Sequence, residues 1–315
     1  MGGVEAFRQL AADLPGNFPA PVLMVLHIGH HHSVLPGLLK PKGPLAPVHA
    51  VDGAPLRAGQ IVIAPPDQHL LVEGNHIRLS RGPKEHFSRP AIDPLFRSAA
   101  MSYGPGAVGV VLTGLLDDGT AGLQAIKACG GIAIVQDPAD AQESSMPLSA
   151  MRHVDVDHCV PLSRMAEVCT TVMAQPLGPQ QSIPAPLQHE HDLANKQGDA
   201  MRHLTEIGKP STFVCPDCRG SLWEMNDARP PRFRCHTGHA YTLRTLQHAQ
   251  SVATDEAMWN ALRALQEQKF LLEKCLALAS EPSDDAQWKA ARVQLEQDLT
   301  ALRKLIEQHV SPEEP

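Results

Sequence analysis

The sequence has few aromatic residues, no excess of basic charge and no long apolar run. Phe, Trp and Tyr make up 4% of the 315 residues, so a packed core must consist mainly of aliphatic side chains. The formal net charge of −7 argues against a general nucleic-acid or membrane-surface binder, because either needs a basic face. No apolar run reaches the roughly 18 residues that a membrane-spanning helix needs. We therefore expect no nucleic-acid partner and no membrane insertion.

The N-terminal residues also lack the pattern of a signal peptide, in which basic, apolar and small residues follow one another. Met1 and Gly2 fit a myristoylation motif, but Ala6 stands where that motif needs serine or threonine. The seven cysteines are an odd number, which does not suit a framework of disulfides. A reducing, cytoplasmic location is the expectation.

Residues 1–175 alternate short apolar runs with helical patterns. Gly74 and Asn75 predict a hairpin turn between two strands, and a helix is expected over 121–129. Four continuous apolar runs predict strands that are buried on both faces, at 22–27, 60–64, 108–112 and 132–135. Strands separated by helices are typical of βαβ units. The predicted fold class is therefore α/β, with a doubly wound, mostly parallel sheet.

The first predicted element is a helix over residues 4–14, and no strand precedes it. An α/β domain can open on a helix. A strand–turn–helix unit whose sequence begins in the turn fits the pattern better.

Three further segments follow the α/β part. Residues 176–211 are polar and interrupted by proline, which is typical of a linker. Residues 212–245 form a compact segment rich in cysteine and histidine. Residues 246–309 carry two apolar stripes at helical spacing with a break near Pro282, and these predict a helical hairpin.

Two polar residues stand at the ends of predicted strands, where reacting groups gather in doubly wound sheets. His27 ends the first apolar run, and Asp118 follows the third. A histidine in such a place can act as a general base, with a carboxylate that fixes its tautomer. From spacing alone the alternatives stay open. His27 could bond only a backbone carbonyl, and Asp118 or Asp117 could cap the next helix.

The segment Leu112–Leu123 contains the pattern T-G-x-x-x-D-G-x-x-G, in which Asp118 is the aspartate. Further blocks stand in the same order along the chain, at 51–53, 63–70, 89–96, 136–138 and 146–147. Together with His27 at a strand end, these blocks resemble the catalytic domain of the CheB-type chemoreceptor methylesterases. The resemblance covers residues 1–175 and is far more specific than any one block.

The resemblance implies an esterase with a Ser–His–Asp triad, in which His27 is the general base and Asp118 orients it. The implied substrate is methyl-esterified glutamate on the cytoplasmic helices of a chemoreceptor, and the products are glutamate and methanol. No cofactor is expected for this reaction.

The start of the chain departs from the family pattern, which has a strand and then Gly-Ala-Ser-[Ala/Thr]-Gly-Gly. Gly2 and Gly3 match the two glycines, Met1 takes the Ala/Thr place, and the nucleophilic serine would fall directly before Met1. We expect Gly2, Gly3 and Leu115 to form the oxyanion and substrate loops. Leu115 and its neighbours also differ from the family signature. Without the serine, this 315-residue form is expected to be inactive.

Two explanations of this departure stay open. A longer natural protein would have the serine, or the chain is a non-catalytic interaction protein on a degenerate esterase fold. The retained His27 and Asp118 favour the first explanation. Ser33 lies in a histidine-rich loop and is not expected to replace the nucleophile. His30, His31 and His32 are expected to be solvated, because adjacent histidines cannot all face one metal ion.

A second constellation lies in the Cys/His segment. Cys215 and Cys218 form a Cys-x-x-Cys knuckle, and Cys235 follows later with His239 close behind. Three thiolates and one imidazole are typical ligands of structural zinc. His236 is the rival fourth ligand, but it directly follows Cys235. The alternatives are a redox dithiol, which lacks a surrounding βαβ unit, and a nucleic-acid-binding ribbon, which the acidic total disfavours.

Overall fold

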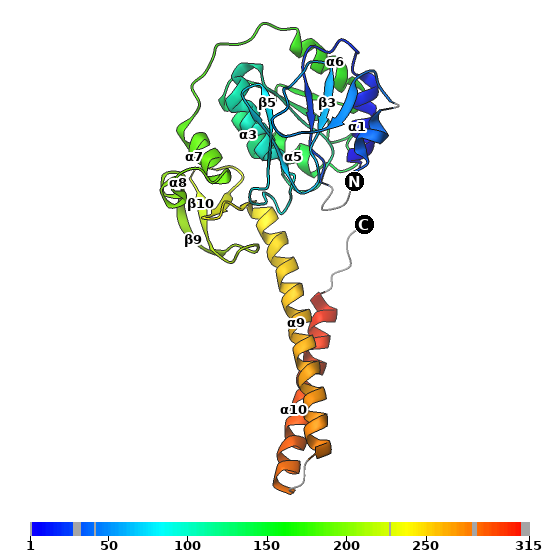
Figure 1. The fold of residues 1–315 in the computed structure, drawn as a ribbon, viewed down its shortest axis with the longest axis vertical. Helices are drawn as coiled ribbons and strands as arrows, with labels where there is room; N and C mark the ends of the chain where they lie inside the picture. Colours follow the sequence, from blue (N-terminus) through cyan, green and yellow to red (C-terminus); the bar gives the residue numbers. More distant parts are fainter. Residues whose placement is uncertain (1, 28–32, 41, 227, 279–281, 310–315) are drawn as a thin grey trace. The chain divides into compact units, whose positions relative to one another are not determined.

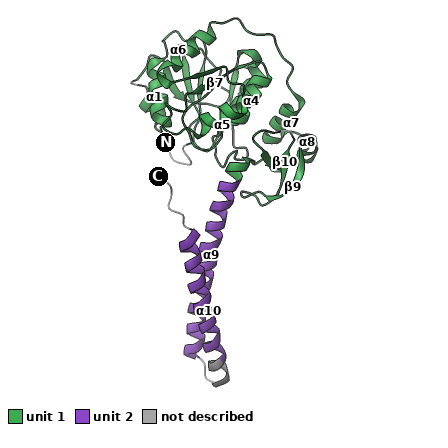
Figure 2. Cartoon of the chain, turned by 180° about the vertical axis from the view of Figure 1, so that it is seen from behind, with its two compact units in different colours: residues 1–246 green, residues 247–315 purple. Residues whose placement is uncertain are grey.

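The computed structural model describes residues 2–27, 33–40, 42–226, 228–278 and 282–309. It divides into two compact units, Met1–Leu246 and Gln247–Pro315 (Figure 2). Met1 and the three histidines at 30–32 lie outside the described residues, so the expectations about them are not addressed by the structure.

Parallel strands form two three-stranded sheets in the first unit (Figure 1). The first sheet has the order β1 (Val22–Met24), β3 (Gln60–Ile63) and β2 (Ala46–His49). The second has the order β6 (Val108–Val111), β7 (Ile132–Gln136) and β8 (His158–Val160). A hairpin of β4 (His69–Glu73) and β5 (His76–Ser80) is antiparallel, as the Gly-Asn turn predicts. The single sheet expected from the sequence is therefore seen as two, with β1 and β6 as outer strands.

Helices cover both faces of these strands, which confirms the doubly wound α/β class. One apolar cluster contains α3 (Ile92–Tyr103), α4 (Thr120–Ala128) and α5 (Ser145–His153). The other contains α1 (Gly3–Asp13), α2 (Leu35–Leu39) and α6 (Leu162–Met173). Successive strand residues point to opposite faces, so Val62 lies in the first cluster while Ile61 and Ile63 lie in the second. Burial on both sides explains the continuous apolar runs.

Residues 176–184 form no helix or strand, as expected of a linker, but the rest of the expected linker contains α7 (Ala185–Ala194), α8 (Ala200–Ile207) and the start of β9 (Gly208–Val214). Pro186 lies in the first turn of α7, where a missing amide proton costs no helical hydrogen bond. Asp199 caps α8, because its carboxylate accepts a hydrogen bond from the Met201 amide at 2.9 Å. Pro186 and Asp199 therefore mark helix starts, whereas Pro176 and Pro179 lie in the irregular stretch.

The Cys/His segment forms a four-stranded antiparallel sheet in the order β12 (Ala240–Thr242), β11 (Arg232–Cys235), β10 (Ser221–Met225) and β9. It belongs to the same compact unit as the α/β part. α9 (Leu243–Leu278) begins in the last residues of the first unit. In the second unit, α9 and α10 (Pro282–His309) form the predicted hairpin around Leu262, Leu295, Leu299 and Ile306. Among the described residues, no helix is both long and apolar enough to cross a bilayer.

Buried charges join the antiparallel sheet to the α/β part. Arg234 is fully buried and lies 2.9 Å from Glu85 and 2.8 Å from Glu190. Arg97 lies 2.6 Å from Glu85, and Arg232 lies 2.8 Å from Glu190. Three arginines and two glutamates therefore share one buried cluster, in which every charge has an opposite partner.

Acid should weaken this cluster. Burial would raise the pKa of Glu85, but the charges of Arg234 and Arg97 outweigh it and lower that pKa from 4.5 to about 2. A carboxylate with a depressed folded-state pKa adds stability above its unfolded pKa and loses it as the pH falls through the folded value. We expect the free energy of unfolding in urea to drop by on the order of 2–3 kcal/mol from this group below pH 4.5.

Glu85→Gln should flatten this acid dependence. Glu73→Gln is the matched control, because Glu73 forms an exposed pair with Arg78 and should keep the wild-type slope. If the free energy of unfolding fell equally steeply for Glu85→Gln and wild type between pH 5 and 3, the expected role of the cluster would be contradicted.

Candidate active site and candidate metal centre

His27 and Asp118 follow β1 and β6 and meet beyond the ends of these strands. Nε2 of His27 lies 2.7 Å from Oδ2 of Asp118. The His27 side chain is 35% exposed, whereas the Asp118 side chain is 2% exposed. A ring that solvent can reach is therefore held by a buried carboxylate. Since Nε2 is bonded to Asp118, Nδ1 of His27 is the nitrogen available to accept a proton.

Backbone amides hold the Asp118 carboxylate in place. Oδ2 accepts from the Ile92 amide at 2.7 Å, and Oδ1 accepts from the amides of Asp93 at 3.0 Å and Gly119 at 2.9 Å. Burial alone would raise the pKa of Asp118. The hydrogen bond from His27 and the positive charge of His86 outweigh that effect and hold this pKa well below its usual range. Asp118 is therefore ionised at neutral pH and can orient His27.

Neither aspartate caps α4. Gly119 is the N-cap residue of that helix, and the side chain that bonds its first turn is that of Asp93, which accepts from the Gly122 amide at 2.6 Å. Asp117 instead accepts a hydrogen bond from the hydroxyl of Thr242 at 2.9 Å. The capping alternative for Asp117 and Asp118 is therefore wrong.

The predicted oxyanion glycines stand at the start of α1. Gly2 is the N-cap, with φ of 79°, and the helix begins at Gly3. A Cβ on Gly2 would lie 2.6 Å from the Gln142 side chain, and one on Gly3 would lie 2.7 Å from Leu26. First-turn amides have no partner within their helix, so they can bind a developing negative charge.

A cavity of about 770 Å³ lies beside the pair and is lined mainly by apolar side chains. His27, Gly3 and the exposed Leu115 all line it. The outer strands β1 and β6 contribute residues from both parallel sheets, among them Val22, Leu23, Met24, Val108 and Val110. Gly3, Leu115 and His27 therefore share one cavity, whereas Gly2 is not among its lining residues; the roles of Gly2, Gly3 and Leu115 stay predictions.

No serine is among the described residues that line this cavity. The Ser33 hydroxyl accepts from the Leu35 amide at 3.4 Å and lies outside the cavity lining. Thr113 does line the cavity, but its hydroxyl donates to the Glu143 carbonyl at 3.1 Å and accepts from the Glu143 amide at 2.8 Å. Both hydroxyls therefore bond backbone groups.

A second histidine, which the sequence analysis missed, lies behind the pair. Nε2 of His86 lies 2.6 Å from Oδ2 of Asp93 and 3.8 Å from Oδ1 of Asp118. Burial lowers the pKa of His86, but the charges of Asp93 and Asp118 and the hydrogen bond to Asp93 raise it to about 9. His86 is therefore a buried cation beside Asp118. It falls in a loop without apolar periodicity, so nothing in the sequence pattern marked it.

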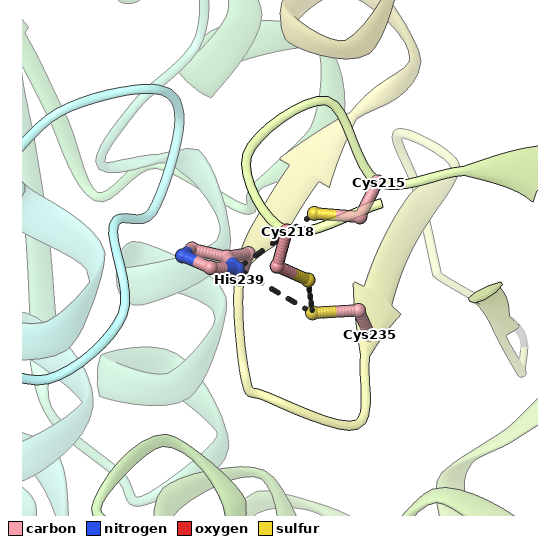
Figure 3. A group of neighbouring side chains, drawn as sticks. All are labelled: Cys215, Cys218, Cys235 and His239. Carbon is pink, nitrogen blue, oxygen red and sulfur yellow. Dashed lines mark hydrogen bonds between the residues drawn. The ribbon is translucent and has the colours of Figure 1, made fainter. Parts of the chain in front are cut away.

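The four predicted metal ligands come together in the antiparallel sheet (Figure 3). Nδ1 of His239 lies 3.7 Å from Sγ of Cys215 and 3.5 Å from Sγ of Cys235. Sγ of Cys218 lies 3.6 Å from Sγ of Cys235. Tetrahedral zinc with Zn–S bonds of about 2.3 Å separates two sulfurs by about 3.8 Å, so the spacing fits this ion. The rival ligand His236 is outside the group and lies over Gly220.

Comparisons with known proteins agree with this architecture. The chain matches the model of the CheB methylesterase family over residues 1–169, more than half of its length. A relative from Leptospira interrogans is 36% identical over 173 residues, covering 53% of this chain and 88% of the relative. The protein-glutamate methylesterase/protein-glutamine glutaminase 2 of Anaeromyxobacter dehalogenans is 38% identical over 166 residues, covering 52% of this chain and 49% of that one.

A solved structure is similar as well. The catalytic domain of the Thermotoga maritima CheB methylesterase aligns with a TM-score of 0.52 and 30% identity, over 54% of this chain and 93% of that domain. Sequence and structure therefore point to the same group of proteins. The chain belongs to the CheB methylesterase family.

Proposed function

We propose that this chain carries the general base and the orienting carboxylate of an esterase that hydrolyses methyl esters of glutamate side chains on the cytoplasmic helices of a chemoreceptor, giving glutamate and methanol. The observation that carries the proposal is the contact of 2.7 Å between His27 and the buried Asp118 beside the cavity. Membership of the family supports ester hydrolysis. The names of the relatives, which state protein-glutamate methylesterase, support the substrate.

In this mechanism, Nδ1 of His27 removes the proton of an attacking hydroxyl. Asp118 fixes the tautomer and stabilises the imidazolium that forms. The amides at Gly2 and Gly3 bind the oxyanion of the tetrahedral intermediate. These steps require no cofactor.

The attacking hydroxyl in this proposal belongs to a serine directly before Met1. That place precedes α1, which suits a nucleophile at a strand-to-helix turn. The 315-residue sequence carries no such serine, and the hydroxyls of Ser33 and Thr113 are engaged elsewhere. We therefore propose that this form is inactive although His27 and Asp118 are in place.

The missing nucleophile can be tested on a methyl-esterified receptor fragment. The 315-residue form should release methanol no faster than its His27→Ala variant, because a base without a nucleophile adds little to the rate. A clear difference between the two rates would show that another nucleophile works with His27. Methanol release by a chain with serine directly before Met1 tests the function itself, and alanine at that place is the control.

A second activity is suggested by the names of the relatives, which also state protein-glutamine glutaminase. Attack on a glutamine carboxamide would form the same glutamyl ester, with ammonia leaving in place of methanol. The same oxyanion site and base would serve both reactions. Ammonia release from a receptor fragment with glutamine at the same positions measures this activity.

The alternative is a non-catalytic interaction protein on the esterase fold. It would bind a partner through the Cys/His sheet or the helical hairpin. Equal inactivity of the serine-bearing and alanine-bearing forms would favour this alternative.

Zinc is the proposed occupant of the Cys/His group. Cys215, Cys218, Cys235 and His239 would supply four ligands, which leaves no position for a substrate, so the role is structural. The sulfur–sulfur and sulfur–nitrogen spacings of 3.5 to 3.7 Å support this ion.

A further inference from the structure

A short segment of the α/β part runs along the metal-binding sheet. The amide of His86 donates to the carbonyl of Ala240 at 2.8 Å, and the amide of Ala240 donates to the carbonyl of Lys84 at 3.3 Å. Glu85 and Ala240 form a parallel bridge. Ala240 directly follows the proposed ligand His239, so the backbone over residues 84–86 is fixed against the metal centre.

The side chain of His86 faces Asp93 and Asp118 in the α/β part. Its backbone is bonded to the metal-binding sheet, while its ring is bonded to Asp93 and lies 3.8 Å from Asp118. The ring is 4% exposed, so solvent does not compensate for its charge. Asp93 in turn accepts from the Gly122 amide in α4 at 2.6 Å. Any shift of the 84–86 backbone would therefore move a buried cation that faces the Asp118 carboxylate.

Two further side chains, Thr242 and Arg234, also connect the metal-binding sheet to the α/β part. Thr242, at the end of β12, donates its hydroxyl to Asp117 at 2.9 Å, directly beside Asp118 in the chain. Arg234, the neighbour of the ligand Cys235, donates to the Gly238 carbonyl at 2.9 Å and to Glu85 at 2.9 Å. Arg234 thereby holds the turn between Cys235 and His239 to the residue before His86.

We infer that the metal centre positions the His27–Asp118 pair through the 84–86 segment, with His86 as the positioning residue. The metal orders β11, β12 and the turn between them. These in turn fix the backbone of His86 and the side chain of Asp117. The inference rests on the proposed function in taking His27–Asp118 as the working pair, and it adds a regulation of that pair by a divalent cation bound at the Cys/His group.

The test follows the His27 ring by NMR in the full chain labelled with ¹⁵N-histidine, and the ring signals are assigned with His27→Gln. In the zinc-loaded protein, His27 should show the single tautomer with the proton on Nε2. Removal of zinc by a chelator should move its ring nitrogen shifts toward a tautomer mixture, and added zinc should restore them. Unchanged His27 shifts in metal-free protein that keeps its circular dichroism would overturn the inference.

Two variants keep the test decisive if the metal-free chain unfolds. His86→Gln and Thr242→Val should each retain about one zinc per chain and still shift the His27 ring nitrogens. His76→Gln, an exposed histidine on β5, is the control and should leave them unchanged. If His86→Gln and Thr242→Val both kept the wild-type ring-nitrogen chemical shifts of His27, the inference would be overturned. Because the readout needs no substrate, a failure of esterase activity in every form would refute the proposed function alone.

Discussion

A chain extended by a short apolar strand that ends in serine directly before Met1 is expected to release methanol at least about 10³ times faster than the 315-residue form. Loss of a nucleophilic serine from such a triad costs about 10⁶ in rate, and the oxyanion site with bound substrate leaves only a residual rate. The proposed mechanism takes His27 as the base, Asp118 as its partner and the glycines at the start of α1 as the oxyanion site, so the added hydroxyl is expected to raise the rate.

The structure provides a place for such a strand. β1 lies at one edge of its sheet and β6 lies at one edge of the other sheet. Both strands contribute residues to the apolar cavity of about 770 Å³. A strand between them would pair with both edges and bury its side chains in that cavity. Its end would then lie beside His27 and directly before α1.

Two controls accompany this experiment. The same extension with alanine in place of serine should stay at the rate of the 315-residue form, and so should the serine form with His27→Ala. Equal methanol release by the serine and alanine extensions would contradict the proposed mechanism. A gain in thermal stability by both extensions would show that the strand itself is bound.

The double variant Cys215→Ser with Cys235→Ser should reduce the zinc content from about one per chain to none. Structural zinc bound by such ligands contributes on the order of 10 kcal/mol of apparent binding free energy, which is folding free energy for a small sheet. We therefore expect the four-stranded antiparallel sheet to lose its ordered structure. Elemental analysis measures the metal, and thermal unfolding measures the stability.

Cys159→Ser is the matched control for this variant. Cys159 lies in β8 and is exposed, outside the Cys/His group. It should keep both the zinc and the unfolding midpoint of the wild type. Zinc retained by the double variant would refute the ligand set.

Local patterns predicted a large part of the fold. The run at 60–64 became β3 because both of its faces are covered by helices, and a strand buried on both sides has to be apolar throughout. His27 and Asp118 could be singled out because each follows such a run. The knuckle at Cys215 and Cys218 could be recognised because its ligands are close in sequence.

Long-range pairing set the limit of the prediction. Glu85 and Arg234 are 149 positions apart, and neither residue has a spacing that marks it as buried. The pKa of His86 is raised mainly by Asp93 and Asp118, which the fold brings to it. Pro186 and Asp199 lie in a polar stretch with few apolar positions, so the sequence predicts a linker there. Their role at helix starts is visible only once α7 and α8 are known to form.

The buried arginines have a consequence for how this protein can be divided. A gene cut after residue 175 would remove Glu190 and Arg234, so Arg97 would keep one counter-ion and Glu85 would lose one of its two. It would also expose the surface on which α7 and β12 rest. We therefore expect the esterase fold expressed without its Cys/His sheet to be less stable than the two expressed, exchanged between proteins or engineered as a single piece.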